Sequence, residues 1–445
     1  MSTQPPPPDR GPHIVVLSSL FPSRLQPGAG LFIRERMFRV GQRLPLAVVS
    51  PVPWFPLQGL LRLWRPGFRP GAPRFERQGA VDVWFPRFFS LPGLLRRFDG
   101  LFMALGAWPR LRALKAAGRL DLIDAHFAFP DGHAAGLLGR WLGVPVTVTL
   151  RGTEVRHAAD AVLRPRLAPA LQRASRVFAV SDSLRRVALG LGLAPERTRV
   201  VGNGVDLERF RPLASPAARA AARAGLGVPE SARVLVSVGG LCERKGFHRV
   251  MACLPSLGQG THAVHLLVVG GPSPEGDWTA RLHSLARELG LQAQVHFTGP
   301  LPAAELCNVL AAADVFVLAT RNEGWANVFL EGMACGLPVV TTDVGGNREV
   351  VATPEVGTIV PFDDATALTE ALRTALDHPW DRAAIRAYAE AHTWDLRVDE
   401  LEAEFRALVP VAAVPVPVFA SASDRQAGAA VGASAHVSAS TAPER

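Results

Sequence analysis

Short apolar runs rich in β-branched residues alternate with helical stretches along almost the whole chain. This alternation is typical of parallel sheets whose strands are joined by crossover helices. In the first half of the chain, strands are expected at 13–19, 46–51, 81–86, 122–127, 144–150, 176–181 and 198–204. In the second half they are expected at 233–240, 264–271, 293–299, 315–320, 338–342 and 357–362. Each set can build its own doubly wound sheet, so the pattern predicts an α/β protein with two Rossmann-like domains facing across a cleft.

Breaks in the pattern suggest where the domains end. We expect a first domain at 13–210, a linker at 211–230, a second domain at 231–378 and C-terminal helices at 379–409. The proline-rich start (1–12) and the Pro, Val, Ala and Ser tail (410–445) carry little that could form a packed core, so both are expected to be disordered.

Length and composition agree with two globular domains. A chain of 445 residues is too long for one hydrophobic core, and 48% hydrophobic with 20% charged residues is ordinary. The cysteines have no C-x-x-C spacing, which favours buried reduced thiols: Cys242, Cys253, Cys307 and Cys335. No apolar run reaches the roughly 20 residues of a transmembrane helix, and the start lacks the pattern of a secretory signal. A cytoplasmic protein is therefore expected.

The net charge of +9 is unevenly placed, because the whole excess lies in the first 110 residues. Arginines there interleave with large apolar residues, at Trp54, Phe55, Arg62, Trp64, Arg65, Phe68, Arg69, Arg74 and Arg77 and again at 94–98. Such a segment can dock on an anionic membrane, here the inner face of the cytoplasmic membrane, or bind a lipid-linked phosphate. A solvated arginine-rich loop is the alternative. Nucleic acid is not favoured, because no recognition motif accompanies the charge.

Glu323 and Glu331 are the most informative residues of the second half. Glu323 follows the expected strand 315–320, and Glu331 lies in the helical segment that ends at a Gly-Leu-Pro stop. The carboxyl end of a strand and the start of a helix form the crevice where open α/β sheets bind ligands and phosphate. Acidic residues near helix starts also simply favour the helix dipole. However, the apolar neighbours of Glu331 predict burial, and a buried carboxylate needs a partner such as a ribose hydroxyl.

Three segments could meet the charge of a phosphate. Arg244 and Lys245 lie at a strand-to-helix turn, and Lys245 is one of only two lysines, with Lys115. Gly28 and Gly30 follow the first strand, where glycines let a backbone approach a phosphate, although a plain turn explains them nearly as well. The helix opening from Trp325 to Val328 offers free amides, with Asn327 as a further side-chain contact. A surface lysine is the structural alternative for Lys245.

The resemblance of these segments to a known family is specific. VGGLCERKG, FTGPLPAAELCNVLAAADVFVLAT, NEGWANVFLEGMACGLPVVTTDVGGNREVV and VGNGVD resemble family 4 of the retaining nucleotide-sugar glycosyltransferases, which have the GT-B fold. The likeness covers roughly residues 13–408 and is strongest across 233–350. HFAFPDG (126–132) and Arg-Gly-Thr-Glu (151–154) are similar to enzymes of teichuronic acid and exopolysaccharide synthesis.

The resemblance implies a donor-binding role for several residues. Glu331 would bind the ribose, Glu323 would lie beside the reacting carbon of the donor sugar, and Lys245 would hold the diphosphate together with Arg244. The amides of Ala326, Asn327 and Val328 would lie near sugar and phosphates. Gly240 stands where many relatives carry an arginine, so Arg244, Arg151 or another first-domain residue would have to replace that charge.

The first domain would supply the acceptor side. His126 matches a histidine close to the reaction centre, although on its own it would more often be a packed core residue. Asp131, Arg151 and Glu154 belong to the same acceptor-side segments.

The implied reaction transfers a sugar with retention by front-face attack, with the leaving phosphate taking the proton of a saccharide acceptor that is lipid-linked at the membrane. No Asp-x-Asp motif stands at a strand end, so neither a metal nor another cofactor is expected. Three other classes of protein are alternatives. A pyridoxal-phosphate phosphorylase needs a Schiff-base lysine, and only Lys245 is a candidate. A nucleotide-sugar epimerase shares the fold, and a non-catalytic nucleotide-sugar binding protein would suit the missing arginine at Gly240.

Overall fold

The computed structural model describes residues 11–64, 68–69, 71–91, 93–258, 263–273 and 275–409. The tail at 410–445, residues 1–10 of the N-terminal segment and Arg65 lie outside the described residues.

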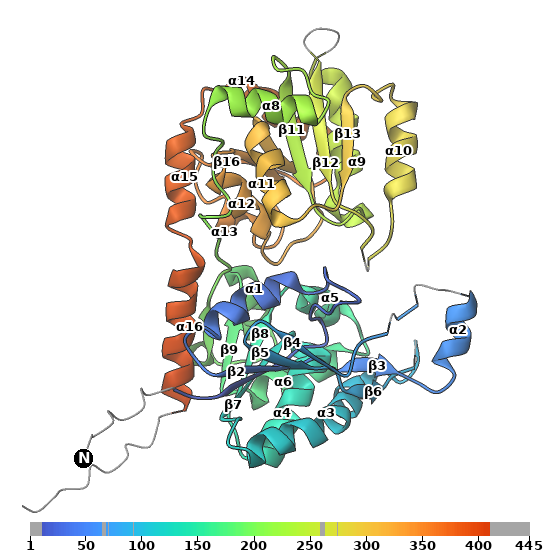
Figure 1. The fold of residues 1–445 in the computed structure, drawn as a ribbon, viewed down its shortest axis with the longest axis vertical. Helices are drawn as coiled ribbons and strands as arrows, with labels where there is room; N and C mark the ends of the chain where they lie inside the picture. Colours follow the sequence, from blue (N-terminus) through green and yellow to red (C-terminus); the bar gives the residue numbers. More distant parts are fainter. Residues whose placement is uncertain are drawn as a thin grey trace, which may run out of the picture. The chain divides into compact units, whose positions relative to one another are not determined.

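The first domain is built on an eight-stranded sheet with the order β10-β9-β8-β7-β1-β2-β5-β4 (Figure 1). All neighbouring strands are parallel except β4, which pairs antiparallel to β5. The strands are β1 (Ile14–Leu17), β2 (Leu46–Val49), β4 (Phe75–Gln78), β5 (Val81–Trp84), β7 (Leu122–His126), β8 (Val146–Leu150), β9 (Arg176–Ala179) and β10 (Thr198–Val200). A separate parallel pair joins β3 (Val52–Trp54) and β6 (Arg87–Phe89).

The second domain contains a six-stranded parallel sheet with the order β13-β12-β11-β14-β15-β16. Its strands are β11 (Arg233–Val238), β12 (Val264–Val269), β13 (Val295–Gly299), β14 (Val315–Leu318), β15 (Val339–Thr342) and β16 (Gly357–Val360). In chain order this is 3-2-1-4-5-6, the order of dinucleotide-binding folds. The predicted fold class, two doubly wound Rossmann-like domains, is confirmed.

Helices cover the sheets on both faces (Figure 1). In the first domain they are α1 (Leu31–Val40), α2 (Gln58–Trp64), α3 (Asp99–Ala116), α4 (His133–Leu142), α5 (Thr153–Ala159), α6 (Arg164–Arg173) and α7 (Asp182–Gly190). In the second they are α8 (Pro216–Gly225), α9 (Phe247–Cys253), α10 (Thr279–Glu288), α11 (Ala303–Ala312), α12 (Asn327–Ala334), α13 (Asn347–Val350) and α14 (Ala365–Asp377), followed by α15 (Arg382–Glu390) and α16 (Trp394–Leu408).

Each sheet separates two apolar cores because successive strand side chains point to opposite faces. On β1, Val15 and Leu17 join one core, while Ile14 and Val16 join the other. Every strand expected from the sequence forms, and those in the middle of the two sheets read as continuous apolar runs because they are buried on both faces. The four cysteines are free and buried, as predicted.

Three strands were not expected from the sequence: β3, β4 and β6. The sequence FERQ of β4 alternates exposed and half-buried residues, so it lacks a buried apolar run. β3 and β6 have only three residues each. A strand that is polar, such as β4, or only three residues long, such as β3 and β6, carries little of the hydrophobic pattern by which strands are recognised.

The C-terminal helix α16 returns to the first domain. Its residues Val398, Leu401 and Phe405 share a core with Ile14 and Val16 of β1. The Phe405 ring meets Phe178 of β9 edge-on, with 6.0 Å between ring centroids. The chain therefore crosses from one domain to the other twice, which ties the two sheets together.

We expect Phe405→Ala to destabilise the protein by about 3–5 kcal/mol, because the ring is fully buried and its removal leaves a cavity. Leu396→Ala on the exposed side of the same helix is the matched control and is expected to change little. Urea unfolding followed by circular dichroism measures both. Equal unfolding midpoints for the two variants would contradict this anchoring role of α16.

Candidate functional site

A cavity of about 460 Å³ opens between the carboxyl ends of the two sheets. Leu20 and Phe127, which follow β1 and β7, line it from the first domain, where the strand order reverses. Gly239 and Glu323, which follow β11 and β14, line it from the second domain, at its own point of reversal. Ligands of open α/β sheets bind at such switch points. The topology of both domains thus leads to the same cavity.

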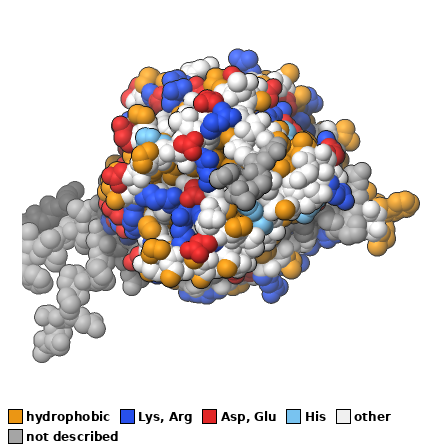
Figure 2. All heavy atoms as spheres, turned by 90° about the horizontal axis from the view of Figure 1, so that it is seen from above, with side chains coloured by type: hydrophobic (Ala, Val, Ile, Leu, Met, Phe, Trp, Pro, Cys, Tyr) orange, Lys and Arg blue, Asp and Glu red, His pale blue; other side chains and the backbone are white. Residues whose placement is uncertain are grey.

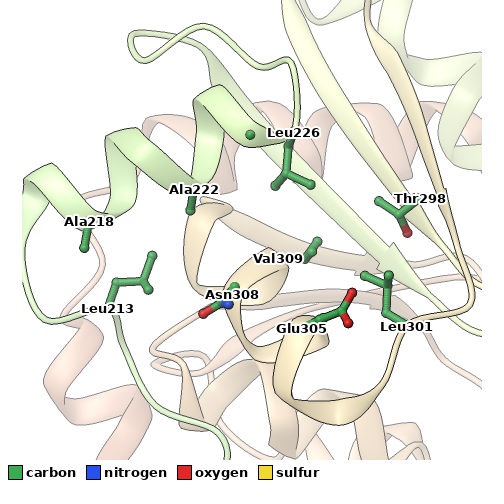
Figure 3. Close-up of a pocket in the computed structure, with 10 residues that line it drawn as sticks. Leu213, Ala218, Ala222, Leu226, Thr298, Leu301, Glu305, Asn308 and Val309 are labelled. Carbon is green, nitrogen blue, oxygen red and sulfur yellow. The ribbon is translucent and has the colours of Figure 1, made fainter.

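A second hollow, of about 450 Å³, lies between α8 and α11 of the second domain (Figure 3). Ala222 and Leu226 are directed there toward Val309 and Asn308. Its lining is mainly apolar, and Glu305 is its one charged residue. It lacks the cations that a phosphate needs, so the interdomain cavity is the candidate site.

Glu323 is held by two cations. Lys245 Nζ donates to Glu323 Oε1 over 2.7 Å, and Arg244 Nη1 donates to the same oxygen over 2.9 Å. The Thr320 hydroxyl adds a third hydrogen bond of 3.1 Å. Burial alone would raise the pKa of Glu323, but the charges of Lys245 and Arg244 outweigh it and lower that pKa below its ordinary value. Glu323 is therefore an ionised, fixed carboxylate.

A glycine positions these cations. Arg244 and Lys245 lie on the short 3₁₀ turn Glu243–Lys245, which ends at Gly246 with φ 75°. A Cβ at Gly246 would lie 1.9 Å from the carbonyl oxygen of Ala319, directly after β14. The turn can therefore approach the end of β14 only with glycine here. Arg244 is shared, because its Nε also donates to Glu275 Oε2 over 2.6 Å.

Gly240 faces a neighbouring loop. A Cβ built there would lie 2.7 Å from Cβ of Ser273. Position 240 is therefore crowded, and a side chain there would require the loop around Ser273 to move. Gly240 itself lines the cavity.

The helix α12 begins at the cavity wall. Ala326, Asn327 and Val328 all line the cavity. The first intrahelical bond runs from the Phe329 amide to the Ala326 carbonyl over 3.1 Å, and no hydrogen bond of the described residues engages the three preceding amides. Orphan amides at a helix start, with the positive end of the helix dipole, suit an anion.

Glu331 lies one helical turn beyond Asn327 on α12 and does not line the cavity. It is half-buried, and no side chain among the described residues hydrogen-bonds its carboxylate. Burial raises the pKa of Glu331 to about 7, with Glu35 adding to the shift and Arg209 opposing it. The first turn of α12 thus lines the cavity, and Glu331 lies on the next turn.

A chain of hydrogen bonds joins the two domains across the cavity. Asn327 Oδ1 accepts from Asn203 Nδ2 over 2.7 Å, and Asn203 Oδ1 accepts from Arg151 Nη1 over 2.9 Å. Arg151 in turn donates to His126 Nδ1, with Nη2 at 3.0 Å and Nε at 3.3 Å. Asn203 lies in the VGNGVD segment but carried no prediction of its own.

His126 is fully buried behind Arg151 and does not line the cavity. Because Arg151 donates to Nδ1, the ring proton lies on Nε2, which faces Asp124 Oδ2 at 3.4 Å. Burial, reinforced by Arg151 and Arg36, holds the pKa of His126 well below its ordinary value. A neutral His126 therefore orients the guanidinium of Arg151.

Arg151 lines the cavity without a carboxylate partner among the described residues. Burial and the nearby charge of Arg36 lower the pKa of Arg151, although Asp124 and Glu154 oppose this. A cation disfavoured in this way is stabilised by a bound anion. Arg151 thus offers the charge that position 240 lacks.

Asp131 and Glu154 hold loops in place rather than lining the cavity. Asp131 accepts from both the amide and the hydroxyl of Ser19, the latter over 3.0 Å, and burial raises the pKa of Asp131 to about 7 despite these bonds. Glu154 accepts from the amides of Ala128 at 3.0 Å and of Gly152 at 2.8 Å. Both carboxylates fix backbone around the cavity.

Gly28 and Gly30 lie on the loop between β1 and α1. Gly30 adopts φ 67° directly before α1, and a Cβ there would lie 2.4 Å from the carbonyl oxygen of Leu20. Gly28 is exposed, and neither glycine lines the cavity. The same region contributes Leu20 and Phe32 instead.

Two further structural findings bear on the expected partners. The described residues hold no group of three or more His, Cys, Asp or Glu side chains suited to a metal ion. Among them there is also no helix that is long and apolar enough to cross a membrane.

The chain matches known proteins in sequence and fold. Residues 218–392 match the family model described as "Glycosyl transferases group 1", and residues 60–209 match "Glycosyltransferase Family 4". The chain is 34% identical to D-inositol 3-phosphate glycosyltransferase 1 of Catenulispora acidiphila, over 68% of this chain and 78% of that protein. It is 29% identical to the putative teichuronic acid biosynthesis glycosyltransferase TuaC of Bacillus subtilis, over 82% and 89%.

Solved structures show the same fold. Sucrose-phosphate synthase of Thermosynechococcus elongatus superposes with a TM-score of 0.70 at 21% identity, over 89% of this chain and 99% of that one. Anabaena HepE in complex with UDP-glucose gives 0.66 at 21% identity, over 88% and 99%. The chain therefore belongs to family 4 of the glycosyltransferases and has their two-domain GT-B fold, as its sequence predicted.

Proposed function

We propose that this glycosyltransferase moves a sugar from a nucleoside diphosphate to a lipid-linked saccharide acceptor, with retention of anomeric configuration, in the synthesis of a polysaccharide or cell-envelope glycan. The charge of the cavity carries the donor assignment. Four cations line it (Arg151, Arg156, Arg244 and Lys245) against two carboxylates (Glu275 and Glu323), an excess of two positive charges. A diphosphate diester carries about two negative charges and would neutralise that excess.

The positions of the two glutamates support the direction in which the donor binds. The diphosphate would lie against Lys245, Arg151 and the amides at the start of α12. The nucleoside would extend along α12, where the half-buried carboxylate of Glu331 can accept from ribose hydroxyls. The sugar would lie beside Glu323.

The state of Glu323 supports front-face transfer over double displacement. A double-displacement site needs a carboxylate nucleophile and a protonated acid about 5 Å apart. Glu323 is paired with Lys245 and Arg244, and Glu275, the other carboxylate that lines the cavity, is paired with Arg244. Neither is therefore placed as a free nucleophile or as a protonated acid, and the ionised Glu323 is suited to stabilise positive charge on the reacting sugar. The leaving phosphate would then take the acceptor proton, while the cations offset the charge that develops on it.

Lys245→Gln is expected to lower sugar transfer by about 10²–10³-fold, because it removes one fixed charge at the leaving group. Purified protein is tested against a panel of UDP-, GDP- and ADP-sugars, and donor hydrolysis and transfer are both followed. Lys115→Gln is the matched control, since Lys115 is the only other lysine and is exposed on α3. The donor assignment fails if no sugar nucleotide is bound or consumed, or if the two variants behave alike.

Glu331→Gln is expected to remove a pH dependence of donor binding. With its pKa raised to about 7, wild-type Glu331 gains its charge only as the pH rises through 7, so the donor KM should fall across that range and the variant should show a flat profile. Ionisation of Glu331 favours donor binding but lowers the stability of the ligand-free protein. Ionisation in the folded state is disfavoured, so the ligand-free variant should melt higher than wild type at pH 8, with a smaller difference at pH 5.

Glu208→Gln, an exposed carboxylate between β10 and α8, is the control for both measurements and should leave them unchanged. A donor KM that varies equally with pH in wild type and Glu331→Gln would contradict the ribose-binding role.

An exposed apolar helix supports association with a membrane. On α2 and just before it, Leu57, Leu63 and Trp64 expose 74%, 77% and 87% of their surfaces. Figure 2 shows hydrophobic side chains gathered at the right-hand edge of the face, where Figure 1 places α2. The helix is anchored from behind: Arg62 Nη2 donates to the Arg69 carbonyl over 2.6 Å, and Arg69 Nη1 donates to the Ser90 carbonyl over 2.7 Å. Isolated exposed apolar residues are common, but a cluster on one projecting helix beside arginines suits an anionic lipid surface.

Replacing Leu63 and Trp64 together by serine is expected to abolish most binding to vesicles that contain phosphatidylglycerol, since it removes the apolar side chains that would enter the lipid. Co-sedimentation with vesicles measures the bound fraction, and high salt should weaken the part that depends on arginines. Leu25 and Leu396, both exposed elsewhere, are replaced by serine as the control. Equal binding by the two double variants would argue against α2 as the membrane contact.

A further inference from the structure

Three unpaired arginines surround a third hollow, of about 460 Å³, in the first domain. Arg74 precedes β4, Arg87 begins β6, and Arg110 lies on α3. No carboxylate among the described residues pairs with any of the three. The nearest acidic residue on β5, Asp82, is already engaged by Arg77 at 3.0 Å and Arg119 at 2.9 Å. We call this hollow the arginine pocket.

The walls of the arginine pocket are built by close backbone contacts rather than by loose side chains. A Cβ at Gly106 of α3 would lie 2.5 Å from the carbonyl oxygen of Arg87, so α3 approaches the start of β6 closely. The Phe85 amide donates to the Arg74 carbonyl over 3.0 Å, which fixes Arg74 against the end of β5. The Arg110 guanidinium stacks over the Trp84 ring at 4.8 Å. The backbone segments that carry the three arginines are therefore held in fixed positions.

The chemistry of this pocket favours a phosphate or diphosphate. Guanidinium groups bind phosphate oxygens with pairs of parallel hydrogen bonds, and an arginine stacked on an aromatic ring keeps its donors free. Three uncompensated positive charges around one hollow suit a group with more than one negative charge. The donor cavity, lined by other residues, is a separate site.

Apolar surface adjoins the arginine pocket, which points to a lipid as the carrier of that phosphate. The Val52 amide donates to the Pro86 carbonyl over 2.8 Å, so β3 is attached to the pocket wall, and Arg87 lies over the Trp54 ring at 6.0 Å. From β3 the chain leads directly to the exposed helix α2. Leu105 of α3, beside Gly106, is 54% exposed as well. A phosphate bound here has apolar surface next to it for a hydrocarbon chain.

The arginine pocket lies at the same carboxyl edge of the first sheet as the interdomain cavity. Trp84 ends β5, and Leu20 and Phe127, which line the donor cavity, follow β1 and β7 at the same carboxyl edge. In the order β7-β1-β2-β5, β5 is two strands from β1, a span of about 10 Å at the usual strand spacing. A saccharide attached to a phosphate in the pocket can reach toward the cavity over that span.

We propose that Arg74, Arg87 and Arg110 bind the phosphate or diphosphate of a polyprenyl-type lipid that carries the acceptor saccharide, with the lipid chain lying along α2. This inference rests on the proposed function, because it names the acceptor of that reaction. The pocket binds and orients; it takes no part in bond making or breaking.

Equilibrium binding of farnesyl diphosphate to the full chain tests the inference without any need for turnover. The triple variant Arg74→Gln, Arg87→Gln, Arg110→Gln is expected to bind it about 10- to 100-fold more weakly than wild type, since it loses several charge-assisted contacts. The matched control is Arg112→Gln, Arg140→Gln, Arg164→Gln, which removes three exposed first-domain arginines outside the pocket. That control should bind within about two-fold of wild type, and the difference between the two triple variants should persist when Lys245→Gln weakens any binding of the diphosphate in the interdomain cavity.

Inorganic pyrophosphate distinguishes a lipid headgroup from a free phosphate. It lacks the hydrocarbon chain, so its affinity for the arginine pocket should be well below that of farnesyl diphosphate. Equal affinity for both ligands would overturn the lipid assignment, and equal binding of farnesyl diphosphate by the two triple variants would overturn the site.

Activity separates this inference from the proposed function. Hydrolysis of the donor without acceptor should be unchanged in the pocket variant, while its KM for a lipid-linked acceptor rises about ten-fold or more. Absence of any donor turnover in the wild type would count against the proposed function, and the binding measurements would still decide the pocket.

Discussion

The ionised Glu323 is the constraint on which the interdomain cavity depends. A buried carboxylate is unfavourable unless it is paired, and two cations from a turn nearly 80 residues earlier in the chain meet it. That meeting requires the turn to touch the end of β14, which only Gly246 allows. The same contact places Lys245 and Arg244 at the switch point of the second sheet. The pairing of Glu323 therefore depends both on the glycine at 246 and on the strand order that places β11 beside β14.

The two domains are coupled through polar contacts of a similar kind. Asn203 joins the start of α12 to Arg151, whose orientation depends on the neutral His126. Close by, Ser183 and Asp182 at the start of α7 donate their amides to Glu349 of the second domain. The helix start of α7 is therefore already occupied by a carboxylate, whereas the start of α12 faces the cavity. This difference explains why only one of the two helix starts is open to an anion in the cavity.

Much of the fold could be predicted because buried parallel strands leave continuous apolar runs. The site was harder to predict, since sequence spacing does not show which groups meet. Glu323 lines the cavity, whereas Glu331, one turn further along α12 than Asn327, does not. Glu275 binds Arg244 from a loop with no recognisable pattern. The return of α16 to the first domain likewise depends on contacts of Phe405 with residues more than 200 positions away, which hydrophobic periodicity along one helix cannot reveal.

Gly240 leaves one wall of the cavity without a side-chain charge, and Arg151 brings a charge to the cavity from the other domain. An arginine there would have to displace the loop around Ser273, and that loop contributes Glu275, which holds Arg244. Arg151 reaches the same cavity from the opposite domain and has no carboxylate partner among the described residues. If Arg151 adds to the charge of Lys245 and Arg244 at the diphosphate, the charge on the leaving group is fully met only while the two domains are together. The electrostatic stabilisation of transfer would then depend on closure of the cleft, because part of it comes from the acceptor domain.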